Sequence, residues 1–291
     1  MSTAVSNDNY YVPHGTHWPI IGSIGLTTTV VGFARYLHGA EMTMMFLGLA
    51  IVIFMMYGWF GQVIDEGIQG LYNKQVDKSF RWGMGWFIFS EVMFFAAFFG
   101  ALFYARVLSI PWLDGASNNA ATAELLWPDF VAAWPLLSVP LAEKFQEANT
   151  AMGAWGLPAL NTVILLISGL TVTLAHHALK RQDREKLVYW LFATVALGFL
   201  FVGLQAWEYS HAYNDLNLRL DSGIYGSTFY MLTGFHGFHV TMGAIMLLVI
   251  MIRAMKGHFS PDNHFAFEAV AWYWHFVDVV WLGLFIFVYW I

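Results

Sequence analysis

Long apolar runs alternate with short polar stretches along most of this chain. A helix that crosses a hydrocarbon core of about 30 Å needs about 20 mostly apolar residues. The runs "MTMMFLGLAIVIFMMYGWF" and "LVYWLFATVALGFLFVGLQAWEY" are typical of such helices. The pattern predicts seven membrane-spanning helices, at about residues 18–36, 42–61, 82–107, 158–179, 187–210, 228–252 and 266–290.

The polar stretches between these runs give the expected domain organisation. Residues 1–17 form a tail before the first span, and 18–61 form a two-helix part. Residues 62–81 are expected to connect it to a second part, 82–291, which holds the other five spans. Within this second part, 108–157 is a long acidic loop outside the membrane.

Composition strengthens the membrane assignment and excludes several kinds of chemistry. The chain is 58% hydrophobic and only 11% charged, whereas soluble domains carry about 25% charged residues. Backbone groups in lipid must bond within the protein, so long apolar runs predict an all-α integral membrane protein. Because the chain has no cysteine, disulfides, Cys-ligated zinc and iron–sulfur clusters are excluded. The net charge of −6 gives no reason to expect nucleic acid as a partner.

Basic residues are unevenly divided between the two sides of the membrane. Nine of the 13 lie on the side of the N-terminus and four on the other. The nine are Lys74, Lys78, Arg81, Lys180, Arg181, Arg184, Lys186, Arg253 and Lys256, and the four are Arg35, Arg106, Lys144 and Arg219. Since cytoplasmic loops are enriched in Lys and Arg, the N-terminus is predicted to be cytoplasmic and the C-terminus external.

Ionisable side chains inside the spans are costly and should face protein or water. With a rise of 1.5 Å per residue, Glu91, His239 and His275 each lie about 13 Å from the inner edge of the membrane. His236 and Asp278 lie about 18 Å from that edge.

Helical spacing places several of these residues on shared faces. His236 and His239 are three residues apart, as are His275 and Asp278, and Glu268 lies two turns before His275. The sequence therefore predicts a polar seam between the sixth and seventh spans. In it, His236 or His239 would contact Glu268, His275 or Asp278.

Three interpretations of these polar groups remain open from the residues alone. They are hydrogen bonds that fix helix packing, a path for protons or ions, and ligands for haem or a metal. The bulky neighbours in "FHGFHV" and "WYWHFVD" argue against room for haem. His176 and His177, at the inner end of the fourth span, are expected at the surface rather than as ligands. Glu91 is either a structural hydrogen-bond donor or a proton-exchanging group.

Four segments resemble the third subunit of the haem–copper cytochrome c oxidases. They are "RWGMGWFIFSEVMFFAAFFGALF" (81–103), "NTVILLISGLTVTLAHHAL" (161–179), "YGSTFYMLTGFHGFHVTMG" (225–243) and "HFAFEAVAWYWHFVDVVWL" (264–282). The resemblance implies two helices leaning away from five, with a lipid-filled cleft between them.

The resemblance also implies a supporting role in respiratory electron transfer from cytochrome c to oxygen, coupled to proton pumping. It implies no catalytic residue and no metal in this chain, with haem and copper in subunits I and II. The chain would stabilise subunit I, support its proton uptake, hold phospholipid, and protect the enzyme from inactivation during turnover. Glu91 matches a buried glutamate proposed in the family to lie near a proton or oxygen route. Cytochrome c would dock nearby on the complex.

Two departures from the family pattern affect these expectations. The second span usually ends in a stretch like "WWRDVIRE", whereas this chain has "WFGQVIDE", with Gly61 and Asp65 at the arginine positions. Guanidinium groups are good phosphate partners, so the lipid-binding candidates become Trp59, Glu66, Arg81, Arg253 and Lys256. The 108–157 loop looks longer than usual. It is expected to cover another subunit, to lend negative potential to cytochrome c docking, or to be an inert insertion.

The expected location is a bacterial inner membrane. One alternative is the third subunit of a quinol oxidase, which resembles this family but typically lacks the two spans found here at 18–61. The other is a free-standing proton channel or transporter that uses Glu91 and the His/Asp seam.

Overall fold

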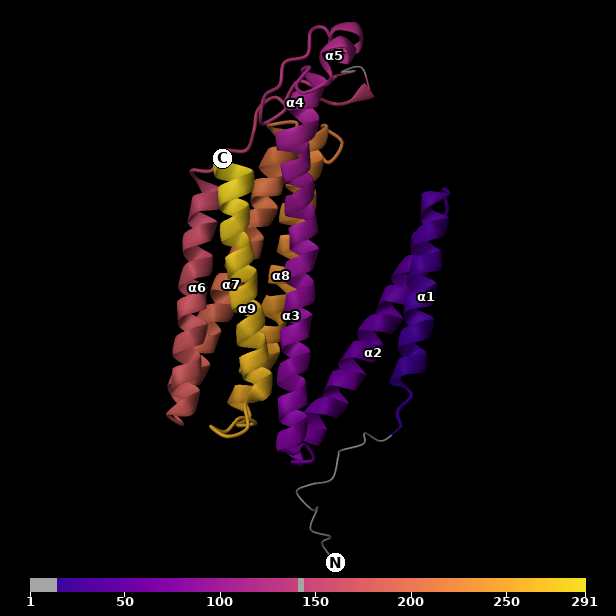
Figure 1. Cartoon of the computed structure of the whole chain (residues 1–291). Helices are drawn as coiled ribbons and strands as arrows, with labels where there is room; N and C mark the ends of the chain where they lie inside the picture. The colour runs from indigo at the N-terminus through magenta and orange to yellow at the C-terminus, as the bar shows by residue number, and fades with distance from the viewer. Residues whose placement is uncertain (1–14, 141–143) are drawn as a thin grey trace, which may run out of the picture. The chain divides into compact units, whose positions relative to one another are not determined.

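The computed structural model describes residues 15–140 and 144–291, and within them the named elements are all helices. They are α1 (Trp18–Leu37), α2 (Thr43–Ile68), α3 (Lys74–Phe103), η1 (Tyr104–Ser109), α4 (Ile110–Leu113), α5 (Ala120–Leu126), α6 (Leu157–Lys180), α7 (Arg184–Asn214), α8 (Ile224–Met255), α9 (Phe265–Leu284) and η3 (Phe285–Trp290) (Figure 1). The predicted all-α class is confirmed.

The seven predicted spans are confirmed as well. In the described part of the chain, seven helices are long and apolar enough to cross a membrane. Two of them contain a π-helical turn: α3, η1 and α4 form one run of 40 residues, and α9 continues through η3. Most of the predicted tail, residues 1–14, lies outside the described residues.

Several helices extend beyond the apolar runs that predicted them. Because α2 ends at Ile68 and α3 begins at Lys74, only residues 69–73 separate them, and most of the connection expected at 62–81 is helical. The connection expected at 108–157 contains α4 and α5. Hydropathy locates the part of a helix that lies in lipid, but polar residues beyond that part continue the same backbone hydrogen bonds.

The chain divides into two compact units, residues 1–82 and 83–291. In the first, α1 and α2 form a hairpin whose backbones approach closely. A Cβ atom at Gly32 would collide with the backbone of Met45, and one at Gly48 with the backbone of Thr29. Small residues at the contact allow this approach, as in other membrane helix pairs. The lipid-filled cleft expected between the two parts stays a prediction.

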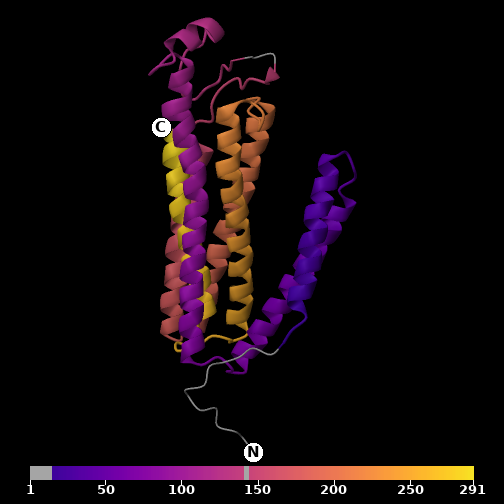
Figure 2. The same ribbon diagram turned by 45° about the vertical axis from the view of Figure 1, so that its right-hand side comes forward.

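The second unit contains α6–α9 together with α3 from Gly83 onward. Helix α6 packs on α7, α7 on α8, α8 on α9, and α9 on α6. Aromatic contacts attach α3 to this group, with Phe94 against Phe235 of α8 and Phe99 against Phe287. The C-terminus, α4 and α5 lie at one end of the unit, and the α6–α7 and α8–α9 connections lie at the other (Figures 1 and 2).

Trp274 occupies the centre of this packing and is fully buried. Its indole lies against Gly198 of α7 and Gly243 of α8, and its Nε1 donates to Ser168 Oγ of α6 at 2.9 Å. A large ring can therefore enter where two neighbouring helices have no side chain, while its one polar atom is satisfied.

We predict that Gly243→Val lowers the free energy of unfolding by about 1–3 kcal/mol through overpacking. A Cβ at Gly243 would lie 2.8 Å from Trp274 Cε3, whereas one at Gly203 of α7 would meet no described atom within 4 Å. Gly203→Val is therefore the matched control. Thermal unfolding of both variants in mild detergent measures the difference, and equal destabilisation would contradict the packing described here.

The start of α7 is fixed by the side chain of Asp183. Asp183 accepts the backbone N–H of Lys186 at 3.1 Å and pairs with Lys186 Nζ at 2.7 Å. These side-chain and backbone hydrogen bonds lower the pKa of Asp183. The cap therefore stabilises the helix fully at pH values above the pKa that Asp183 has in the unfolded chain. This contribution is lost as the pH falls through the lower pKa that Asp183 has in the folded protein.

Candidate functional site in the membrane-spanning bundle

Glu91 of α3 and His239 of α8 form a direct contact inside the second unit. His239 Nε2 lies 2.9 Å from Glu91 Oε2, and only 9% and 20% of the two side chains are exposed. The depths calculated from the sequence placed both residues at about 13 Å, and this contact confirms that they lie at one level. Phe94, Phe95 and Tyr273 surround the imidazole.

The second ring nitrogen of His239 shows how many protons the pair must hold. Its Nδ1 lies 2.6 Å from the carbonyl oxygen of Phe235, and a carbonyl can only accept, so Nδ1 carries hydrogen. The hydrogen bond between Nε2 and Glu91 then needs one more proton, held by the carboxyl group or by an imidazolium. In both forms the pair is neutral overall and holds one transferable proton.

His236 is used differently, although it lies one turn from His239. It is fully buried, and its Nε2 donates to the carbonyl oxygen of Val277 in α9 at 3.1 Å. Its ring packs against Trp281 and Phe201. His236 therefore ties α8 to the backbone of α9, and its Nδ1 has no hydrogen-bond partner among the described residues.

His275 and Asp278 of α9 face α6. His275 Nε2 lies 3.3 Å from Thr173 Oγ1. Asp278 Oδ2 would lie 3.0 Å from a Cβ atom at Gly169, so the carboxylate sits directly against the α6 backbone. The close approach depends on Gly169 lacking a side chain.

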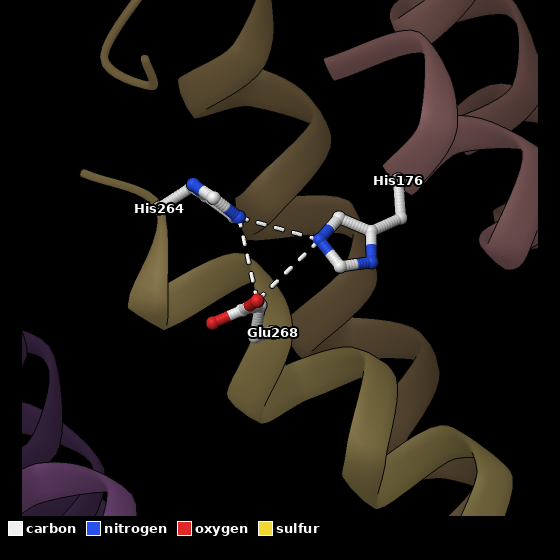
Figure 3. A group of neighbouring side chains, drawn as sticks. All are labelled: His176, His264 and Glu268. Carbon is white, nitrogen blue, oxygen red and sulfur yellow. Dashed lines mark hydrogen bonds and ion pairs between the residues drawn. The ribbon is translucent and has the colours of Figure 1, made fainter. Parts of the chain in front are cut away.

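Glu268 lies in the first turn of α9, close to two histidines. Its Oε1 is 3.5 Å from His176 Nε2 of α6 and 3.4 Å from His264 Nε2, just before α9 (Figure 3). The surface role expected for His176 is thus replaced by contacts with two other polar side chains.

These contacts differ from the predicted seam between the sixth and seventh spans. The histidines of α8 bond to Glu91 and to the backbone of α9, whereas His275, Asp278 and Glu268 meet residues of α6 or the turn before α9. Spacing of three residues correctly placed His275 and Asp278 on one face. Spacing within a helix, however, does not reveal which neighbouring helix that face meets.

The lipid-binding candidates divide between the two units. In the first, Trp59 is 49% exposed, Glu66 accepts from Gln62 and Tyr72, and Arg81 pairs with Asp77 at 2.8 Å. The Glu66 carboxylate is thus occupied by neighbours in its own unit.

In the second unit, Arg253 and Lys256 lie at the C-terminal end of α8. The Arg253 guanidinium carbon lies 4.7 Å from the centre of the Phe259 ring. Its buried Nε has no hydrogen-bond partner among the described residues. Lys256 is exposed at the C-cap of α8. Arg253 thus has donor capacity left for an anion.

Sequence reasoning missed the buried pair of Glu208 and Tyr289. Glu208 is fully buried in α7 and accepts from the Tyr289 hydroxyl at 2.7 Å. This bond attaches the C-terminal turn η3 to α7. The only signal in the sequence is the carboxylate in "LQAWEY", and a carboxylate near the end of a span costs little to hold there and does not by itself indicate a buried partner.

Comparison with known proteins identifies the family of this chain, which the geometry of the site alone does not. The chain matches the protein family described as "Cytochrome c oxidase subunit III" over residues 8–121 and 134–291. This chain belongs to the cytochrome c oxidase subunit III family. The unmatched residues 122–133 fall inside the connection expected to be longer than usual.

Individual relatives agree over nearly their full length. "Cytochrome c oxidase subunit 3" of Drosophila yakuba is 42% identical over 286 residues, covering 98% of this chain and 97% of the relative. The protein of the same name from Anopheles gambiae is 42% identical over 100% of this chain and 99% of its own length. That of Marchantia polymorpha is 42% identical, covering 94% and 92%. Membership in this family favours neither a quinol oxidase nor a free-standing channel, and it places the chain in a multi-subunit oxidase in a membrane.

Proposed function

We propose that this chain is a non-catalytic core subunit of a respiratory cytochrome c oxidase, assembled against subunits I and II. The observation that carries the proposal is the family match over nearly all of the chain, whose described residues form seven helices long and apolar enough to cross a membrane. In this proposal haem and copper belong to the partner subunits. His239 supports it, because both of its ring nitrogens take part in hydrogen bonds, and the rings of both His236 and His239 pack among aromatic side chains.

The proposed contribution to the reaction is a proton-holding group beside subunit I. The Glu91–His239 pair supports this role, since its hydrogen-bond geometry requires one shared proton (see above). A pair that is neutral overall can be held in a low-dielectric environment at less cost than a lone carboxylate. The pair would deliver or buffer protons that subunit I takes up during oxygen reduction.

We further propose an orientation and a location. The nine basic residues predicted on the N-terminal side favour a cytoplasmic N-terminus and a periplasmic C-terminus. A bacterial inner membrane is our proposed location, although the relatives named above come from insects and a plant. Cysteine labelling from either side of sealed vesicles, at an introduced cysteine in the α6–α7 turn, tests the orientation.

Bound phospholipid is the remaining part of the proposal, and Arg253 is its best-supported residue. A guanidinium group binds a phosphate through two parallel hydrogen bonds, and Arg253 has a buried nitrogen with no partner in the described structure. We predict that Arg253→Gln lowers the amount of phospholipid retained by the purified complex. Arg181→Gln, an exposed basic residue at the same end, is the control. Lipid mass spectrometry measures both, and equal retention would contradict the assignment.

Purification of a tagged chain in mild detergent tests the proposed function as a whole. The expected result is that larger partner chains, haem and copper purify with it, and that the preparation oxidises reduced cytochrome c. Oxidation of quinol instead of cytochrome c would support the quinol oxidase alternative. A chain that purifies alone and transports protons in vesicles would contradict the proposal.

A further inference from the structure

Three side chains converge at the inner end of the bundle: His176 from the last turns of α6, His264 immediately before α9, and Glu268 in the first turn of α9 (Figure 3). His176 Nε2 and His264 Nε2 are 3.3 Å apart. Glu268 Oε1 lies 3.5 Å from the former and 3.4 Å from the latter. We call these residues the His–His–Glu triad.

The triangle formed by these three atoms has the dimensions of one face of a tetrahedral metal site. Zinc binds imidazole nitrogen at about 2.0–2.1 Å and carboxylate oxygen at about 2.0–2.2 Å, which separates tetrahedral ligand atoms by about 3.3–3.5 Å. The three observed separations, 3.3, 3.4 and 3.5 Å, fall in this range. An ion could therefore bind with little movement of the side chains.

The ring orientation of His264 leaves a lone pair facing the centre of the triad. Its Nδ1 lies 3.1 Å from the carbonyl oxygen of Ser260, so Nδ1 carries hydrogen and Nε2 presents a lone pair to the triad. Histidine ligands in metal sites commonly donate their other N–H to a backbone carbonyl in this way. Ser260 is itself fixed by paired backbone hydrogen bonds with Asn263.

Because His264 Nε2 and Glu268 Oε1 both present lone pairs, either a hydrogen on His176 Nε2 or a metal ion must lie between them. A neutral His176 with its hydrogen on Nε2 supplies the hydrogen bond, and a metal ion would take the place of that hydrogen. The triad is accessible from outside the bundle, since 25% of the His176 side chain and 14% of the Glu268 side chain are exposed. An ion could enter by this route, and a water molecule could complete its coordination.

We propose that the His–His–Glu triad binds one divalent zinc-type cation, with water as the fourth ligand. Two imidazoles and one carboxylate form a donor set that zinc accepts in proteins. The bound ion would join the inner end of α6 to the start of α9, residues 88 positions apart in the chain. The site is separate from the Glu91–His239 pair and does not depend on the proposed function.

The test is zinc binding by the purified complex after treatment with a chelator. The unaltered protein is expected to bind one equivalent of added Zn²⁺ at the triad. Zinc X-ray absorption should show imidazole ligands with metal–ligand distances of about 2.0–2.1 Å. His176→Ala and Glu268→Gln are expected to weaken this binding at least tenfold, since loss of supporting residues alone costs about 10–100-fold. His177→Ala is the matched control, because His177 is the exposed neighbour of His176 and lies outside the triad.

Two results would overturn the proposal. One is equal zinc affinity in the intact protein, His176→Ala and His177→Ala. The other is an absorption spectrum of the zinc-loaded protein without imidazole ligands, which would leave the triad joined by hydrogen bonds alone. Because the spectrum is recorded on the unaltered protein, it decides the question even if the triad variants fail to assemble.

Discussion

Replacement of Trp274 by alanine is expected to lower the free energy of unfolding by about 3–5 kcal/mol, the range for large aromatic residues removed from a packed core. The indole is fully buried between Gly198 and Gly243, two positions that have no side chain with which to fill the space. The change would also remove the donor to Ser168 Oγ. The cavity would therefore open where α6, α7 and α8 meet α9.

Trp272→Ala provides the matched control for this prediction. Trp272 lies on the same helix two residues away and is 38% exposed, so its removal is expected to cost far less. Thermal or denaturant unfolding of both variants in the same detergent gives the comparison. Similar losses in the two variants would show that Trp274 does not occupy the centre of the five-helix part.

Replacement of Glu91 by glutamine is expected to slow proton uptake severalfold and to shorten the turnover lifetime of the assembled oxidase. The glutamine amide can still donate to His239 Nε2, so the contact between α3 and α8 is retained, but it has no ionisable proton that it can give up at working pH. Glu91→Ala is expected to have the same functional effect and also to lose the interhelical hydrogen bond, worth about 0.6 kcal/mol on average.

Glu124→Gln is the control for the glutamate series, because Glu124 is an exposed carboxylate in α5. Stopped-flow measurement of proton uptake and of activity over many turnovers separates the variants. If Glu91→Gln matches the unaltered enzyme in both measurements, then Glu91 serves packing alone. The comparison works because the glutamine keeps the geometry and removes only the acid.

The sequence was sufficient to predict the membrane-spanning helices and part of the arrangement of polar residues between them. Apolar runs of about 20 residues predict membrane helices because only helices and closed barrels satisfy the backbone in lipid. Depth along a span correctly placed Glu91 and His239 at one level. The ends of the helices were predicted less accurately than their apolar centres. Helix α3, for example, begins at Lys74, well before the apolar run that predicted it.

The sequence did not show which helix packs against each polar helix face. The predicted seam required α8 to meet the acidic face of α9, but that face meets Thr173 and Gly169 of α6. The triad is a similar case, because His176 and His264 approach only once α6 and α9 are packed side by side. Such contacts depend on the order of helices around the bundle, which periodicity within one helix does not encode.

Selective removal of this chain from the assembled oxidase tests the central claim most directly. The account predicts that the haem and copper spectra and the first turnovers survive, while proton uptake slows and the enzyme inactivates sooner during turnover. Adding back the purified chain should restore both properties. Loss of haem or copper together with the chain, or an unchanged rate of proton uptake and lifetime without it, would contradict the account.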